Sequence, residues 1–179
     1  MKIAIIGTHS TGKTTLKNAL AKQLQEQGHT VTHLPEFARL CPFPINEQTT
    51  VAAQAWILNE QISNEKQTYR PGMFLLCDRS TIDNFAYLYR AAHADEIQMY
   101  ERLAAQHMKT YHAIFKTTRL DIDPVHDKVR STDGTFREEI DTIIHNLIEK
   151  HSIPCHILPA TTDINEHLAF IHQKITATA

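Results

Sequence analysis

The segment GTHSTGKTT, residues 7–15, constrains the fold of this chain more than any other. It follows the apolar run KIAII (residues 2–6) and precedes a segment with leucines at helical spacing, which predicts a buried strand, a glycine turn and an amphipathic helix. The spacing G-x-x-x-x-G-K-[ST] is that of a loop whose backbone N–H groups converge on a phosphate at a helix N-terminus. We therefore expect a phosphate-binding site at the end of the first strand.

Each residue of this loop has a candidate role in binding a nucleoside triphosphate. Gly7 and Gly12 permit backbone conformations that other residues adopt only at a steric cost. We expect Lys13, as an exposed loop charge, to reach the β- and γ-phosphates, and the Thr14 hydroxyl to coordinate Mg²⁺. The candidate ATP-binding residues are Gly7, Thr8, His9, Ser10, Thr11, Gly12, Lys13, Thr14 and Thr15.

Short apolar runs recur along the chain at residues 30–34, 73–77, 112–116 and 154–158. Between and after them lie segments that predict helices, at residues 13–27, 46–69, 81–92, 94–109, 135–150 and 163–176. This alternation predicts an α/β fold in three layers, with a five-stranded parallel sheet between two layers of helices. With no internal repeat or linker, the 179 residues predict a single domain over 1–179.

One segment breaks the alternation. Residues 117–135 are rich in charge, contain a proline and a glycine, and show little periodicity. A loop of this length is usually functional or disordered, so we interpret it as a lid, with an inert surface excursion as the alternative.

Composition argues against several classes of partner. The formal net charge is −2, without a basic stripe, so no nucleic acid is expected. No apolar run approaches the roughly 20 residues needed to span a bilayer, so we expect no membrane partner and a cytoplasmic protein. The three cysteines form no C-x-x-C pair and the histidines no H-E-x-x-H pattern, which favours reduced thiols and gives no metal site of those types.

A second group of candidate residues follows the apolar run that ends at Cys77. Asp78 comes at the carboxyl end of this predicted strand, where α/β sheets bind ligands, and is a candidate ligand for Mg²⁺. Its alternative role is a helix N-cap. Arg79, beside it, is placed to meet an anionic substrate or product.

Glu36 and Arg39 follow the second predicted strand and should face the same crevice. If the substrate presents a hydroxyl, Glu36 fits the role of general base; if it presents a phosphate, the arginines matter more. A structural Glu36–Arg39 pair at i, i+3 spacing is the alternative.

The stretch DRSTIDNFAY, residues 78–87, is similar to the DRYxxSxxAYQ signature of thymidylate kinases and to the ERS motif of deoxyribonucleoside kinases. The chain as a whole resembles the ribosylnicotinamide-kinase-like family of small P-loop proteins, often described only as AAA-type ATPases. The matching segments are residues 7–15, 33–39, 77–80, 127–130 and 135–139. Asp83 stands where thymidylate kinases have a serine and Leu88 where they have a glutamine, which argues against thymidine monophosphate as the substrate.

This resemblance implies a P-loop NTPase fold with strand order 2-3-1-4-5. It also implies ATP-dependent phosphoryl transfer, with Mg²⁺, to a nucleoside, a nucleotide or a ribosylnicotinamide-like acceptor. Arg130 and Arg137 match the lid arginines of the family, which would close over the γ-phosphate. The implied catalytic residues are thus Lys13, Asp78, Glu36, Arg130 and Arg137, and the candidate acceptor-binding residues are Glu36, Arg39, Arg79, Asp83 and Tyr87.

Two other functions stay open at this point. A nucleotide-binding switch or regulatory ATPase would use the same loop without an acceptor. A nucleic-acid-processing ATPase is the third alternative, and a homodimer is one alternative for the oligomeric state.

Overall fold

The computed structural model describes residues 1–45, 49–91, 94–120 and 134–176. Its strands are β1 (Lys2–Ile6), β2 (Val31–Leu34), β3 (Phe74–Asp78), β4 (Ala113–Lys116) and β5 (His156–Ile157). They form one five-stranded sheet in the order β2-β3-β1-β4-β5, and every pairing is parallel. The predicted sheet and its order are confirmed, although β5 is shorter than the predicted run 154–158.

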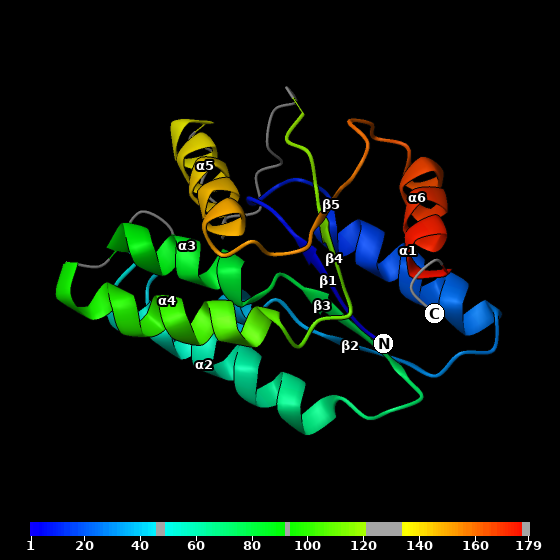
Figure 1. The fold of residues 1–179 in the computed structure, drawn as a ribbon, viewed down its shortest axis with the longest axis horizontal. Coiled ribbons are helices and arrows are strands. Elements are labelled where there is room, and N and C mark those ends of the chain that lie inside the picture. The colour runs from blue at the N-terminus through cyan, green and yellow to red at the C-terminus, as the bar shows by residue number, and fades with distance from the viewer. Residues whose placement is uncertain (46–48, 92–93, 121–133, 177–179) are drawn as a thin grey trace.

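The helices lie in two layers, one on each side of the sheet (Figure 1). Helices α1 (Lys13–Glu26) and α6 (Ile164–Thr176) cover one face. The other side of the sheet is covered by four helices, α2 (Val51–Thr68), α3 (Thr81–Ala91), α4 (Ala94–Met108) and α5 (Gly134–Lys150). A short 3₁₀ helix, η1 (Phe37–Leu40), follows β2. This is the three-layer arrangement that the alternation of apolar runs predicts.

Strand β1 shows why the core has two halves. Successive side chains of a strand point to opposite faces, so Ile3 and Ile5 pack with α1 and α6, whereas Ala4 and Ile6 pack with the helices of the other layer. All four are essentially inaccessible to solvent. Each buried isoleucine contributes about 1.5–3 kcal/mol, so β1 anchors both layers at once.

Helix α2 begins later than predicted. The Thr50 side chain accepts a hydrogen bond of 3.2 Å from the Ala53 backbone N–H, which caps the helix and fixes its start at Val51. Of the residues 46–50 that the prediction assigned to this helix, 46–48 lie outside the described part of the chain.

The predicted lid, residues 117–135, is described only at its two ends. Thr117 donates its backbone N–H to the Ile6 carbonyl at 2.9 Å and is buried, and the Thr118 hydroxyl donates to the Leu158 carbonyl at 2.8 Å. Residues 134 and 135 belong to α5. The sheet and α5 therefore hold the two ends of this segment. Residues 121–133 lie outside the described part of the chain, so the lid stays a prediction.

A buried polar cluster closes the amino-terminal end of the sheet. Glu65 of α2 lies 2.8 Å from Lys2 Nζ and 2.7 Å from His107 Nε2, and it also accepts a hydrogen bond from the Tyr111 hydroxyl. The Glu65 carboxylate is inaccessible to solvent. Because both its oxygens are engaged, the charge is compensated where it is buried.

Within the described residues, no helix combines the length and the apolar character that crossing a membrane requires.

Candidate functional site

The glycine-rich loop joins the carboxyl end of β1 to the start of α1. Three of its residues have positive φ: Gly7 at 132°, Ser10 at 58° and Gly12 at 76°. At Gly7 a side chain would not fit, because a Cβ atom would lie 2.4 Å from the Thr117 hydroxyl oxygen. The Gly7 N–H donates to Asp83 Oδ1 at 2.7 Å. The start of the loop is thus held between α3 and the residue that follows β4, and its other end leads directly into α1.

Lys13 is not the exposed loop charge that we expected. It is 5% exposed, its ammonium group donates to the Thr8 carbonyl, and it lies 3.4 Å from the Thr11 hydroxyl. Burial, together with the positive charge of Arg79, lowers the pKa of Lys13 to about 7. An anion bound in the loop would therefore stabilise the charged form of Lys13 directly.

Thr14 and Asp78 form a compact oxygen-donor pair next to the loop. The Thr14 hydroxyl donates to Asp78 Oδ2 at 2.6 Å, and the Lys17 ammonium lies 3.5 Å from the same oxygen. Asp78 is buried, and its Oδ1 has no hydrogen-bond partner among the residues that the structure describes. Hard oxygen donors of this kind suit Mg²⁺, which commonly takes one or two protein ligands and completes its shell with water and phosphate. The residues present therefore fit a magnesium ion at this position.

Asp83 occupies a place that the sequence did not indicate. Its Oδ2 accepts from the Ser80 N–H and hydroxyl at 2.9 and 2.8 Å, while Oδ1 binds Gly7. Burial raises the pKa of Asp83, although the charge of Arg79 acts in the opposite direction. Through these hydrogen bonds Asp83 connects the start of α3 to the loop. Among the described residues, Asp83 is not one of those that line the cavity beside the loop.

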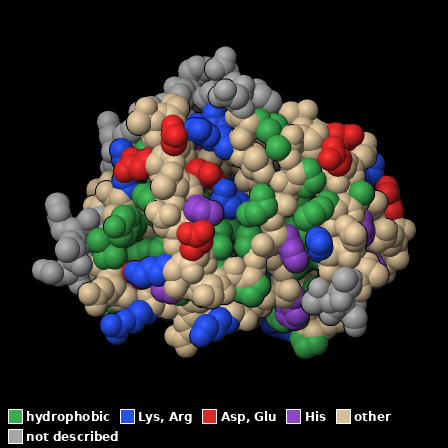
Figure 2. Space-filling model, turned by 45° about the horizontal axis from the view of Figure 1, so that its top comes forward, with side chains coloured by type: hydrophobic (Ala, Val, Ile, Leu, Met, Phe, Trp, Pro, Cys, Tyr) green, Lys and Arg blue, Asp and Glu red, His purple; other side chains and the backbone are tan. Residues whose placement is uncertain are grey.

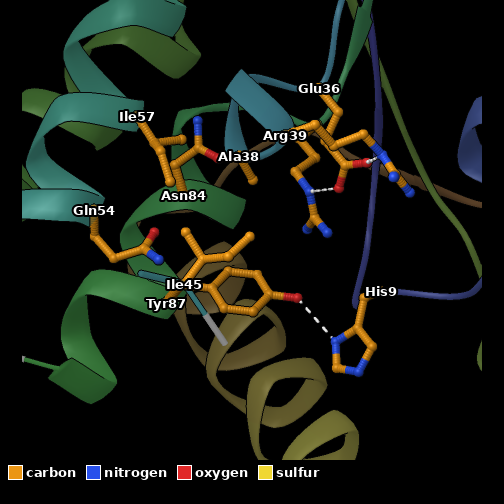
Figure 3. Close-up of a pocket in the computed structure, with 10 residues that line it drawn as sticks. His9, Glu36, Ala38, Arg39, Ile45, Gln54, Ile57, Asn84 and Tyr87 are labelled. Carbon is orange, nitrogen blue, oxygen red and sulfur yellow. Dashed lines mark hydrogen bonds and ion pairs between the residues drawn. The ribbon is translucent and has the colours of Figure 1, made fainter. Parts of the chain in front are cut away.

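A cavity opens beside the loop, on the side of β2 and α3 (Figure 3). Polar and apolar side chains share its wall. The lining residues are His9, Glu36, Ala38, Arg39, Ile45, Gln54, Ile57, Arg79, Asn84 and Tyr87. Four of the five predicted acceptor-binding residues are therefore brought together here, the exception being Asp83.

Glu36 is the centre of the charged part of this wall. Its two oxygens are held separately, Oε1 by Arg79 Nε at 2.9 Å and Oε2 by Arg39 Nε at 3.0 Å. The predicted i, i+3 pair of Glu36 and Arg39 is thus present, and Arg79, which follows β3, forms a second ion pair with Glu36. Burial of Glu36 and Arg79 makes this pairing far less screened than a surface ion pair.

Arg79 is held in a strained conformation. Its φ of 82° lies in the left-handed region, which costs a residue with a side chain about 1–3 kcal/mol. Its backbone N–H donates to the Ile5 carbonyl at 3.0 Å. The Arg79 Nη1 is buried and has no hydrogen-bond partner within the described residues, which leaves a donor for an anionic group.

A second, larger cavity lies on the other side of the loop. Its lining comes from the loop, from the segment after β4, from α5 and from the start of α6. The residues are Ser10, Thr11, Gly12, Thr15, Leu16, Thr117, Thr118, Leu120, Arg137, Thr161, Thr162, Ile164 and His167. A smaller hollow lies directly over residues 10–15.

Of the two predicted lid arginines, the structure describes one. Arg137 is buried in the first turn of α5 and lines the larger cavity, where burial and the charge of Arg119 lower its pKa. Arg130 lies outside the described residues. The face at the carboxyl ends of the strands, turned forward in Figure 2, carries acidic, basic and histidine side chains side by side among hydrophobic ones.

Sequence reasoning missed Gln54 and Asn84, which line the smaller cavity. Asn84 precedes Tyr87 by three residues on α3, so helical spacing could have indicated that the two share a face. Gln54 gives no local signal, because its place in the wall depends on how α2 packs against α3.

The parallel sheet in this order, with a G-x-x-x-x-G-K-[ST] loop after its central strand, defines a P-loop NTPase fold of the kinase-like type. The chain belongs to the AAA domain family, whose model matches residues 2–167. A search of curated proteins finds no significant sequence match.

Solved structures with similar folds include the NadR protein, a thymidylate kinase and a deoxyadenosine kinase. The NadR protein in complex with NAD and AMP-PNP is 17% identical to this chain, with a TM-score of 0.72. The match covers 96% of this chain and 48% of the NadR chain, so this chain spans about half the length of NadR. The thymidylate kinase from Ehrlichia chaffeensis is 18% identical, with a TM-score of 0.64 and coverages of 99% and 97%. The deoxyadenosine kinase from M. mycoides, with dCMP and dCDP bound, is 16% identical, with a TM-score of 0.65 and full coverage of both chains.

Proposed function

We propose that this chain is a kinase, in a single domain over residues 1–179, that transfers the γ-phosphoryl group of ATP to a nucleoside, a nucleotide or a related small molecule. One observation carries the proposal: two cavities of different lining meet at the glycine-rich loop. A nucleotide switch requires only the larger cavity, to which the loop contributes Ser10, Thr11, Gly12 and Thr15. A kinase requires a second cavity for the acceptor next to the γ-phosphate.

The reaction assigns a role to each group of residues. An acceptor oxygen forms a bond to the γ-phosphorus, the bond from phosphorus to the bridging oxygen breaks, and the electron pair remains on ADP. Lys13 and Arg137 would neutralise charge on the transferred group. Mg²⁺, held by Thr14 and Asp78 directly or through water, would neutralise further phosphate charge.

Glu36 and Arg79 lie on the acceptor side of this reaction. With a hydroxyl acceptor, Glu36 would orient the O–H group and receive its proton before the proton passes to water. Its two arginine partners favour the charged carboxylate, so Glu36 would act chiefly by orientation and not as a strong base. With a phosphate acceptor, Arg79 Nη1 and Arg39 would bind the phosphate oxygens.

The similar structures suggest which acceptors to test. One NadR structure contains NR, and the other two enzymes are a thymidylate kinase and a deoxyadenosine kinase. A panel of ribosylnicotinamide, deoxyadenosine, other nucleosides and nucleoside monophosphates therefore spans the relevant chemistry.

The experiment measures ADP release from MgATP with each member of this panel. We expect at least one acceptor to accelerate ADP release by about 10-fold or more over the rate without acceptor, since water is a poorly positioned nucleophile. If no acceptor accelerates ADP release while the protein binds ATP, the regulatory-ATPase alternative replaces this proposal.

A further inference from the structure

We infer that Phe136 and Arg90 are positioning residues, which tie the first turn of α5 to the wall of the smaller cavity and thereby place Arg137 for phosphoryl transfer. The inference rests on the proposed kinase function and adds to it two residues that, among those the structure describes, line neither cavity. It provides a physical link between an acceptor in one cavity and a nucleotide in the other.

Two adjacent residues of α5 belong to different parts of the site. Arg137 lines the larger cavity, and only 6% of it is exposed. Phe136 is buried in the hydrophobic cluster that contains Ile82 and Phe85 of α3. Because successive residues of a helix are rotated by about 100°, a single turn can direct Phe136 toward α3 and Arg137 toward the larger cavity. A movement of Phe136 therefore also moves Arg137.

The Phe136 ring packs on two residues that line the smaller cavity. Its centroid lies 6.0 Å from that of Tyr87, in an edge-on arrangement, and 5.4 Å from that of His9 in the glycine-rich loop. Aromatic contacts of this kind favour particular relative orientations of the rings. An acceptor that shifts the Tyr87 ring would therefore change the packing of Phe136 without touching it.

Arg90 holds the same turn of α5 from α3. The Arg90 guanidinium carbon lies 4.4 Å from the Phe136 ring centroid, and Arg90 Nε donates to Glu139 Oε2 at 2.7 Å. Tyr87 and Arg90 are three residues apart on α3, as are Phe136 and Glu139 on α5, so each pair shares one face of its helix. These four side chains form one contact between two helices that pack together (Figure 1).

Orientation, more than stability, is what Arg90 supplies. Its side chain and that of Glu139 are 31% and 47% exposed, so water screens their ion pair, which contributes little to folding. A planar guanidinium that pairs with a carboxylate and lies over a ring does, however, restrict how the two helices are oriented. Orientation matters for Arg137, because a misplacement of about 1 Å in a catalytic site can cost about 10²-fold in rate.

The consequence is that the two cavities are coupled. An acceptor that orders Tyr87 would order Phe136 and with it Arg137, and a nucleotide that contacts Arg137 would act in the reverse direction. Such coupling is reciprocal, so the acceptor and the nucleotide should raise each other's affinity by the same factor. The role of Arg90 and Phe136 is to position Arg137, and it adds no step to the transfer.

The test is a double-mutant cycle of Arg90→Gln, Arg137→Gln and the double variant. Arg90→Lys is the conservative replacement, Phe136→Leu removes the ring but keeps an apolar side chain, and Arg102→Gln, at an exposed position of α4, is the matched control. Steady-state kinetics are measured with ribosylnicotinamide, deoxyadenosine and thymidine monophosphate. Calorimetry measures the Kd of AMP-PNP with and without each of these acceptors, and thermal unfolding gives Tm.

We expect Arg137→Gln to lower kcat by about 10²-fold or more, the scale for a lost group that stabilises developing charge. Arg90→Gln and Phe136→Leu should each lower kcat by about 10-fold through misplacement of Arg137. In the Arg137→Gln background, Arg90→Gln should change kcat by less than about 2-fold, since its effect passes through the missing side chain. Arg90→Lys should recover most of the loss, and Arg102→Gln should match wild type.

AMP-PNP binding gives a readout besides turnover. In wild type, an acceptor that is phosphorylated should tighten AMP-PNP binding by about 5-fold or more. Arg90→Gln should abolish this tightening but change the Kd of AMP-PNP without acceptor by less than about 2-fold, because Arg90 does not line the larger cavity.

Other outcomes overturn the inference. Additive losses of kcat in the double variant would show that Arg90 does not act through Arg137, and a wild type whose AMP-PNP affinity no acceptor changes would show that the cavities are not coupled. A lower Tm for Arg90→Gln, with unchanged kcat and unchanged tightening, would make Arg90 a structural residue. If Phe136→Leu does not fold, the Arg90 variants decide by the same criteria.

The same measurements separate this inference from the proposed function. If wild type phosphorylates no acceptor, the proposed function fails and the inference with it. If wild type phosphorylates an acceptor and the Arg90 and Phe136 variants match it, only the inference fails.

Discussion

The Thr14 hydroxyl donates a hydrogen bond of 2.6 Å to Asp78 Oδ2, although 64 residues separate the two in sequence. The contact forms because β1 and β3 are neighbours in the sheet, with Ile5 opposite Asp78. It brings together the two oxygen donors that the sequence assigned to Mg²⁺. The alternative role of Asp78 as a helix cap is not what the described contacts show, since it is Asp83 that accepts the hydrogen bonds at the start of α3.

This pair gives the first prediction. Asp78→Asn keeps the shape of the side chain but removes its charge, so Mg²⁺-dependent turnover should fall by about 10²-fold or more, the scale of lost stabilisation of developing charge. Binding of AMP-PNP in the presence of EDTA should change little. Magnesium titrations of ADP release and calorimetry measure the two effects, and equal losses with and without metal would show a structural role for Asp78.

The burial of Lys13 gives a prediction about stability. Lys13→Met should abolish ATP use but raise Tm at pH 7, because it removes a cation that the folded protein buries. The pKa of Lys13 is about 7 when folded, against 10.5 in the unfolded chain, so the folded state binds fewer protons between these values. The contribution of this group to stability therefore rises with pH from about 7 to 10.5, and the substitution should remove that rise.

Thermal unfolding of Lys13→Met and wild type across this pH range tests whether the substitution raises Tm and removes the rise of stability with pH. Lys22→Met is the matched control, because Lys22 lies on the same helix but is exposed. It should leave both activity and the pH dependence of stability unchanged. A lower Tm for Lys13→Met would contradict the account of Lys13 as a buried charge.

The close approach of Gly7 to Thr117 gives a third prediction. Gly7→Ala should destabilise the fold by more than about 1 kcal/mol, because its Cβ meets the Thr117 hydroxyl and its φ of 132° is unfavourable for alanine. Adding Thr117→Ala removes the clash but not the unfavourable φ, so it should recover only part of the loss. Denaturant unfolding of the single and double variants measures this coupling. Strict additivity of the two losses would show that the contact carries no strain.

The buried cluster around Glu65 gives a fourth prediction, on acid stability. Burial opposes ionisation, but hydrogen bonds from His107 and Lys2 and the charge of Lys2 lower the pKa of Glu65 to about 2. Because this value lies below the ordinary 4.5, Glu65 contributes stability above pH 4.5 that is lost progressively as the pH falls toward 2.

Glu65→Gln should abolish this contribution and lower stability at pH 7 by about 3–5 kcal/mol, since it leaves Lys2 buried without a counter-charge. Denaturant unfolding between pH 2 and 7 measures both effects. Glu26→Gln, at an exposed position of α1, is the control and should change stability by less than about 0.5 kcal/mol. A parallel pH dependence in wild type and Glu65→Gln would rule out Glu65 as the source.

Sequence patterns predicted the sheet and the loop because both depend on local signals. The alternation of apolar runs marks the strands, and the spacing of Gly7, Gly12 and Lys13 marks the loop. The strand order came from resemblance to known kinases, since periodicity alone does not say which strands are neighbours.

What the sequence could not predict depends on tertiary contacts. Lys13 was expected to be exposed because it lies in a glycine loop, but the loop folds its side chain back onto Thr8. Asp83 was assigned to the acceptor by resemblance, yet the Gly7 N–H and Ser80 take both its oxygens. Gln54 reaches the smaller cavity only through the packing of α2 on α3. Each difference arises where segments far apart in the chain meet.

In the proposed kinase, the two cavities serve phosphoryl transfer between two bound substrates. Phosphorus-31 NMR of a reaction with MgATP and an accelerating acceptor measures it most directly, because it resolves ADP, inorganic phosphate and a phosphorylated acceptor in one sample. We expect one phosphorylated acceptor for each ADP, with little inorganic phosphate, and no such product with Lys13→Met. Formation of ADP and inorganic phosphate in equal amounts, without a phosphorylated acceptor, would contradict it.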